Sequence, residues 1–294
     1  MLIKLTEKLY FIAGERKGMF PFCHGLLVNA DIKVLIDSSF GRSRLEPIQA
    51  FGNVDVIINT HYHPDHTYGN RLFPNAKIWA HHLDAPALFS REVFLTYTGL
   101  NRIENRISLE DQFPGRFAKR HVARVLSDGE LLDFGGISLQ VVHLPGHTPG
   151  HIGFYQSDEG ILFSSDIDLS PFGPWYGNAR SDLEDFIVSI RKVANFNPRV
   201  LVTSHTGIIV DRIPERVKVY EEIIEKRDER ILNALSAEKS MTELVNMKLI
   251  SKRFSEPEEI ARFFEQVMLE KHLERLISQG KVVSKANGYY KVCF

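Results

Sequence analysis

The chain has 294 residues, of which 44% are apolar and 25% are charged, and its formal net charge is −1. This composition suits a globular protein with one large domain, or a large and a small one, and the charge excludes a chain that is basic throughout, as nucleic-acid-binding proteins often are. With two cysteines, we expect neither a disulfide framework nor a Cys-based zinc site. Because the sequence has no run of about 18 apolar residues and no signal-peptide pattern, we expect no membrane span and a cytoplasmic location.

Short apolar runs bounded by turn residues predict several strands in the first part of the chain. We expect them at residues 9–13, 25–30, 33–37, 54–59 and 77–80, with a helix at 42–51. Residues 84–120 then combine aromatic and charged side chains at partly helical spacing, which indicates a mostly helical insertion. Such an insertion either packs against the core or forms the roof or wall of a pocket.

Strands return in the second half of the chain. We expect them at residues 130–134, 137–143, 151–156, 161–164 and 199–203. Gly135-Gly136 predicts a hairpin between the first two of these strands. Apolar residues at helical spacing predict a helix over 182–194, with Ser181 as its N-cap, and a long charged helix from about Pro214 to Leu235.

The end of the chain has a pattern of its own. Helices are expected within residues 241–249 and 257–279, followed by a hairpin of 281–284 and 288–292. Helices followed by a two-stranded ribbon are typical of a winged helix-turn-helix. We therefore predict a large domain at residues 1–229 and a small winged-helix domain at residues 230–294.

The densest group of polar residues directly follows the predicted strand at 54–59. It contains His61, His63, Asp65 and His66. Because residues i and i+2 of an extended segment share a face, His61 and His63 can bind one ion together. Asp65 and His66 lie beyond Pro64 and can face a second ion. Imidazole and carboxylate ligands suit zinc, and also manganese or iron(II).

Three further polar spots each follow a predicted strand. The first is the segment Gly146-His147-Thr148-Pro149-Gly150-His151, in which the two glycines permit unusual backbone angles around His147. The second contains Asp166 and the third contains His205. In α/β sheets such strand ends gather at one edge, where ligands bind. His151 is expected to support or pack against the site rather than to bind a metal.

These motifs resemble those of the metallo-β-lactamase superfamily, over roughly residues 5–225. The His-x-His-x-Asp-His motif is complete at His61 to His66, and the other three spots follow in the family's order. The resemblance implies the α/β fold class, as a four-layer αβ/βα sandwich. It also implies that one metal is held by His61, His63 and His147, the other by Asp65, His66 and His205, and that Asp166 bridges them.

Two residues affect the assignment of metal ligands that the resemblance implies. Ser165 precedes Asp166 where relatives often have glycine, and Asp168 is a rival for the bridging position. In addition, a glutamate at position 63 would indicate the diiron redox branch, so His63 favours a hydrolytic site with two Zn²⁺ ions, with Mn²⁺ or Fe²⁺ as the alternatives.

The expected reaction is hydrolysis by a metal-bound hydroxide, because two metals that share a water lower its pKa towards neutrality. Asp65 is expected to orient the hydroxide. Tyr176, in the aromatic segment that follows Asp166, is expected to donate to an oxyanion, and Trp175 and Phe172 beside it suit a small or partly apolar substrate. The favoured substrate is a small-molecule thioester, ester or lactone, as in the glyoxalase II and lactonase branches.

The main alternative is a metal-dependent endoribonuclease that acts on single-stranded RNA. A sandwich with a C-terminal winged helix is similar to the group of β-lactamase-like 2 proteins, which includes such enzymes. However, residues 211–294 contain 16 Lys and Arg against 15 Asp and Glu, and this balance does not favour RNA binding. The winged helix could instead form a homodimer contact or a lid. A further alternative is that it makes the protein a non-catalytic regulator.

Overall fold

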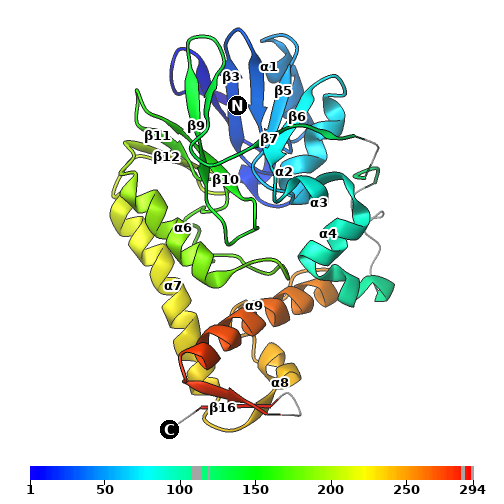
Figure 1. Cartoon of the computed structure of the whole chain (residues 1–294), viewed down its shortest axis with the longest axis vertical. Coiled ribbons are helices and arrows are strands. Elements are labelled where there is room, and N and C mark those ends of the chain that lie inside the picture. The colour runs from blue at the N-terminus through cyan, green and yellow to red at the C-terminus, as the bar shows by residue number, and fades with distance from the viewer. Residues whose placement is uncertain (107–113, 118–119, 286–288, 293–294) are drawn as a thin grey trace.

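The computed structural model describes residues 1–106, 114–117, 120–285 and 289–292 (Figure 1). The seven-stranded and six-stranded sheets pack against each other, with helices on their outer faces and the C-terminal elements at the far end of the molecule. Part of the predicted insertion and the turn of the predicted C-terminal hairpin lie outside the described residues.

The first sheet has seven strands in chain order, β1 to β7. Neighbours from β1 to β4 are antiparallel, whereas β4, β5, β6 and β7 run parallel to one another. The strands are β1 (Leu2–Lys4), β2 (Leu9–Ile12), β3 (Gly25–Asn29), β4 (Lys33–Ile36), β5 (Val56–Asn59), β6 (Lys77–His81) and β7 (Val122–Leu126). The two edge strands β1 and β7 were not predicted; β1 is short, and β7 is largely exposed and has no apolar alternation.

The second sheet has six strands, in the order β13-β12-β11-β10-β9-β8. Its pairs are antiparallel except for β11 and β12, which are parallel. The strands are β8 (Leu131–Asp133), β9 (Ser138–His143), β10 (Ile152–Gln156), β11 (Ile161–Phe163), β12 (Val200–Thr203) and β13 (Gly207–Ile209). Gly135 and Gly136 have φ values of 92° and 79°, which confirms the predicted hairpin between β8 and β9 and shows why both positions need glycine.

Three separate apolar cores define four layers. Alternate residues of the first sheet, such as Val34 and Ile36, pack with Val141 and Phe163 of the second sheet to fill the space between the sheets. The residue between them, Leu35, belongs to the core under the helices that cover the first sheet. A third core lies between the outer face of the second sheet and its helices. This order of helices, sheet, sheet and helices confirms the predicted sandwich.

The helices that cover the first sheet are short, and the two that cover the second sheet are longer. The first sheet is covered by α1 (Leu45–Gln49), α3 (Ala85–Phe89) and α4 (Arg91–Thr98), and the second by α6 (Leu183–Asn195) and α7 (Ile213–Ala234). The described part of the insertion is mostly helical, as predicted, and also includes the short 3-10 helices η4 (Leu100–Arg102) and η5 (Glu104–Arg106) and a turn at residues 114–117. The N-cap of α6 is Asp182, which accepts from the Asp185 backbone N–H, and the predicted cap Ser181 is therefore wrong by one position.

The C-terminal elements are two helices and a small sheet. They are α8 (Met241–Asn246), α9 (Glu258–Ser278) and the strands β14 (Lys239–Ser240), β15 (Val282–Ser284) and β16 (Tyr289–Val292), paired in the order β14-β16-β15. In Figure 1, α9 passes from the lower end of α7 to a position beneath α4. Its Phe263 and Val267 belong to the core of the first sheet's helices, and its Leu269 and Leu273 to that of the second sheet's helices. The winged-helix assignment and the boundary at residue 230 stay predictions.

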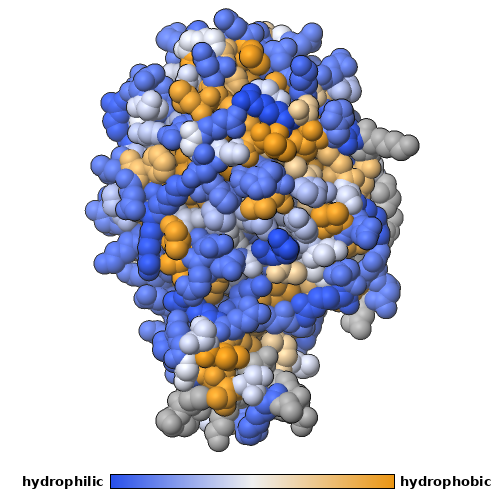
Figure 2. All heavy atoms as spheres, in the orientation of Figure 1, coloured by the Kyte–Doolittle hydropathy of each residue, from blue (hydrophilic) through white to orange (hydrophobic). Residues whose placement is uncertain are grey.

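The surface is mixed in character. On the face shown in Figure 2, apolar residues are interspersed among polar ones. Exposed large apolar side chains are scattered along the described chain, from Met19 and Phe20 to Val188 and Val219. Among the described helices, none has both the length and the apolar character that a membrane crossing requires.

Candidate metal centre

Four strands from the two sheets deliver the polar spots to one place. β5 ends at Asn59, two residues before His61, and β11 ends at Phe163, three residues before Asp166. β9 and β12 end at His143 and Thr203, and the loops that follow them carry His147 and His205. The short helix α2 (Pro64–Thr67) turns the chain after His63, so that Asp65 and His66 face the same centre from the other side.

The first group of donor atoms belongs to His61, His63, His147 and Asp166. His147 Nε2 lies 2.9 Å from His63 Nδ1, 3.3 Å from His61 Nε2 and 3.2 Å from Asp166 Oδ2. The three histidines are almost fully buried. Ring nitrogens that converge at this spacing in a buried place are what a tetrahedral metal site requires of its ligands.

The second group belongs to Asp65, His66 and His205. Asp65 Oδ2 is 3.8 Å from His66 Nε2 and 3.6 Å from His205 Nε2. The other carboxylate oxygen of Asp166, Oδ1, is 3.1 Å from His66 Nε2 and 3.4 Å from His205 Nε2. Asp166 therefore faces both groups, one oxygen to each. Asp168, the rival for this position, instead accepts from the Ser170 backbone N–H and belongs to neither group.

Outer hydrogen bonds fix which nitrogen of each histidine faces inwards. His66 Nδ1 donates to Asp37 Oδ2 at 2.8 Å, His147 Nδ1 to the Trp175 carbonyl at 2.8 Å, and His205 Nδ1 to the Gly18 carbonyl at 2.6 Å. Because the proton of a neutral imidazole is then on Nδ1, the lone pair of Nε2 points to the centre in all three. In its neutral form, the form that binds a cation, each of these rings directs an unprotonated nitrogen to the centre.

His63 is oriented in the opposite sense. Its Nδ1 faces the centre, and its Nε2 lies 2.5 Å from the side-chain amide of Asn178. The Asn178 oxygen, by contrast, is buried and has no partner among the described residues. With the amide turned by 180°, this oxygen accepts the Nε2 proton, and the lone pair of Nδ1 is free for a metal.

The charges of the centre point to bound cations. Burial, reinforced by the neighbouring imidazoles, lowers the pKa of His61 and His63 well below the ordinary histidine value. Burial by itself would raise the pKa of Asp166, but His66, His205 and the other nearby histidines hold it well below its usual range. His66 Nε2 and Asp166 Oδ1 are buried and lie 3.1 Å apart, but neither atom makes a hydrogen bond of suitable geometry with a described residue. A divalent cation would satisfy both atoms, so the donor set fits the implied metals.

Two carboxylates that support the centre were not predicted from the sequence. Asp37, directly after β4, accepts from His66 and from both the backbone N–H and the hydroxyl of Thr60. Asp84 accepts from the Thr148 hydroxyl at 2.6 Å and the Gly150 backbone N–H at 2.7 Å, and thereby fixes the turn that carries His147. Burial raises the pKa of Asp84 to about 7. Asp37 could have been found by its position at a strand end, whereas nothing in the local sequence distinguishes Asp84.

The insertion packs against the first motif. Arg116 donates to the Tyr62 carbonyl at 2.5 Å and to the Thr67 hydroxyl at 3.0 Å, and its guanidinium lies 4.4 Å from the ring centre of Phe94. Burial lowers the pKa of Arg116 to about 9. The described part of the insertion therefore forms a wall beside the metal-binding turn.

The structure corrects the predicted role of Tyr176. Its side chain is fully buried, and its hydroxyl is bonded to His272 Nε2 and to Arg227. A hydroxyl with both partners inside the protein cannot donate to a substrate. His151 lies as predicted, since its Nδ1 donates to the Leu144 carbonyl and its Nε2 accepts from the Asp166 backbone N–H. Ser165 has a φ of 50°, a left-handed conformation that glycine adopts more easily than serine.

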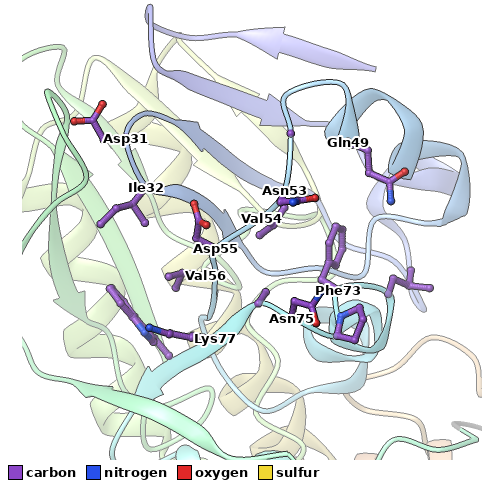
Figure 3. Close-up of a pocket in the computed structure, with 15 residues that line it drawn as sticks. Asp31, Ile32, Gln49, Asn53, Val54, Asp55, Val56, Phe73, Asn75 and Lys77 are labelled. Carbon is purple, nitrogen blue, oxygen red and sulfur yellow. The ribbon is translucent and has the colours of Figure 1, made fainter.

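A hollow of about 660 Å³ lies elsewhere on the molecule (Figure 3). It is bordered by the turn before β4 and by the segments that lead into β5 and β6, and residues such as Asp55, Phe73 and Lys77 line it. The candidate ligands of the first motif instead follow the far end of β5. This hollow is therefore separate from the candidate centre.

Comparison with known proteins agrees with this geometry. The model of a family described as the metallo-beta-lactamase superfamily matches residues 24–205. The human acyl-coenzyme A thioesterase MBLAC2 is 33% identical over 181 residues, which are 55% of this chain and 61% of that protein. An atrochrysone carboxyl ACP thioesterase of Aspergillus fumigatus is 24% identical over 69% of this chain and 56% of its own length. The chain thus spans about three fifths of these two relatives.

A solved structure resembles the whole chain. The crystal structure of a metallo-beta-lactamase family protein from Thermus thermophilus superposes with a TM-score of 0.80 and 26% identity. The match covers 99% of this chain and 100% of that one. The likeness therefore extends beyond the two sheets to the C-terminal elements.

Proposed function

Because the chain belongs to the metallo-beta-lactamase superfamily, we propose that it is a dinuclear metal-dependent hydrolase of small-molecule thioesters. The observation that carries this proposal is the convergence of seven side chains into two donor groups, with one oxygen of Asp166 facing each group. Oxygen esters and lactones are the alternative substrates.

The metals and the protein have separate tasks. Two bound Zn²⁺ ions, with Mn²⁺ or Fe²⁺ as the alternatives, would acidify a water and polarise the substrate carbonyl. Asp37, Trp175 and Gly18 keep the Nδ1 protons of three histidines on the outer side. Asp65 is 8% exposed and lies against His66 and His205, a position from which its carboxylate can orient the attacking water.

Two observations support a thioester substrate. Both relatives named above are thioesterases: one is an acyl-coenzyme A thioesterase, and the other is an atrochrysone carboxyl ACP thioesterase. In addition, the partly exposed Trp175 has its ring centre 5.4 Å from that of His63 and 5.5 Å from that of His147. An indole at this place offers an apolar wall for an acyl group directly beside the first donor group.

The charges on α9 give the RNA alternative no support. Lys271 donates to the Ala179 carbonyl, and Arg275 pairs with Asp228 and Glu184. Lys271 and Arg275 lie in the part of α9 that an RNA-binding helix would need to present, and both are engaged within the chain. Arg262, earlier on α9, likewise pairs with Glu258. A nuclease would require a basic surface elsewhere.

The test is a substrate screen with the zinc-loaded chain. Acyl-coenzyme A and acyl-glutathione thioesters, oxygen esters, lactones and single-stranded RNA are compared at equal enzyme concentration. We expect hydrolysis of at least one thioester, with loss of that activity on metal removal and in His63→Ala. His121→Ala, which removes an exposed histidine, is the matched control and should keep full activity. Cleavage of RNA alone, or wild-type activity in His63→Ala, would contradict the proposal.

A further inference from the structure

The segment between Phe172 and Asn178 supports two of the candidate ligands. The Trp175 carbonyl accepts from His147 Nδ1 at 2.8 Å, and the Asn178 amide lies 2.5 Å from His63 Nε2. The position of this segment, named here the 172–178 loop, therefore decides where the lone pairs of His63 and His147 point. Outer partners of this kind typically influence metal affinity about 10- to 100-fold.

The loop is held by a single arginine on α7. Arg227 donates to the Phe172 carbonyl at 2.6 Å, to the Pro174 carbonyl at 2.5 Å and to the Tyr176 hydroxyl at 2.9 Å. Its side chain is fully buried, at 0% exposure. A guanidinium has five donors in a rigid plane, so it can fix three acceptors of one loop at once.

A second contact reaches the same loop from α9. His272 Nδ1 donates to Asp228 Oδ1 at 2.6 Å, and His272 Nε2 accepts from the Tyr176 hydroxyl at 2.5 Å. Arg275 then donates to Asp228 Oδ2 at 3.1 Å. Tyr176 and His272 are both 0% exposed. A continuous chain of hydrogen bonds thus joins α7, α9 and the loop, and no water is needed to complete it.

A buried polar network of this size is not required for stability. In other proteins, apolar side chains of similar volume often replace buried polar groups without loss of stability, whereas a network with directed partners favours one arrangement of its members. We propose that Arg227, Tyr176 and His272 are positioning residues of the metal centre, through which α7 and α9 set the orientation of His147 and His63. This inference rests on the metal-binding part of the proposed function.

Zinc affinity measured on the full chain tests the proposal without any substrate. The variants are Tyr176→Phe, which removes the shared hydroxyl, and Arg227→Lys, which keeps the charge but not the planar fork. Glu265→Gln is the matched control, because Glu265 is also buried on α9 but accepts from the backbone N–H groups of Ile250 and Ser251 instead. Each protein is titrated against a competing chelator, and the visible spectrum of its Co²⁺ form is recorded.

We expect Tyr176→Phe and Arg227→Lys to bind the zinc ion of the first donor group about tenfold more weakly than the wild type, and the spectrum of their Co²⁺ forms to shift. Glu265→Gln should lower the midpoint of thermal unfolding but leave affinity and spectrum unchanged. Should Arg227→Lys not fold, Tyr176→Phe carries the test alone, since it removes one oxygen atom. Wild-type affinity and spectrum in Tyr176→Phe would overturn this inference and leave the proposed function standing. A wild-type chain that bound no metal would overturn both.

Discussion

Replacing Asp37 by asparagine should weaken the second metal position. Asp37 accepts from His66 Nδ1 at 2.8 Å, from the Thr60 backbone N–H at 2.9 Å and from the Thr60 hydroxyl at 2.9 Å. An asparagine has one acceptor oxygen, so its NH₂ group must face one of these donors. If that donor is His66, its proton moves to Nε2, and the lone pair no longer points to the metal.

The expected loss is about 10- to 100-fold in metal affinity, which corresponds to about 1.4 to 2.8 kcal/mol of binding free energy. The backbone should not change, because Asp37 has a φ of 63° and asparagine tolerates this left-handed conformation. The first donor group is linked to Asp37 only indirectly, through the Thr60 hydroxyl, which lies 3.1 Å from His61 Nδ1, and its affinity should therefore change less.

Stepwise zinc titration with a competing chelator separates the two affinities. Asp55→Asn is the matched control, because Asp55 also accepts from a backbone N–H of the first sheet, that of Lys33, but at the opposite end of β5. If Asp37→Asn binds both ions as tightly as the wild type, or if Asp55→Asn loses as much affinity, Asp37 does not support the second metal position.

Three further predictions concern stability. Phe186→Ala should cost about 3 to 5 kcal/mol in urea unfolding, because Phe186 is 0% exposed in the core between α6 and the second sheet; a loss below about 1 kcal/mol would contradict this packing. Asp182→Ala should cost about 1 kcal/mol by removing the N-cap of α6, and a neutral change would reject the cap. Burial, with His143 and His82 beside it, lowers the pKa of His81 to about 3, so the unfolded chain binds more protons below about pH 6.5 and stability is lost as the pH falls towards 3. His81→Phe should flatten this slope in denaturant unfolding at several pH values, and an unchanged slope would speak against it.

The positions of most strands, and the polar residues that gather in the candidate centre, could be predicted from the sequence because both depend on local patterns. Each ligand follows an apolar run that forms a buried strand, and strands such as β5 and β11 end at the same edge of the sandwich. The motif around His61 to His66 carries its geometry in its own spacing. Prediction was less successful where an element is short or exposed, as in β1, β7 and β13.

The roles that the sequence did not reveal depend on partners far along the chain. Tyr176 follows Asp166 closely, and its position alone suggested a substrate contact. Its hydroxyl instead bonds to His272, 96 positions away, and to Arg227, 51 positions away. Arg116 and Asp84 likewise contact motifs that are distant in sequence. No local pattern encodes such pairs, because they form only when the layers pack together.

We expect the chain to bind two metal ions in adjacent sites that share Asp166. Metal content after dialysis against Zn²⁺, measured by elemental analysis, tests it most directly. We expect two zinc ions per wild-type chain, one in His205→Ala, which removes a ligand of the second group alone, and fewer than two in Asp166→Ala. A wild-type chain with a single ion, or His205→Ala with two, would contradict the account.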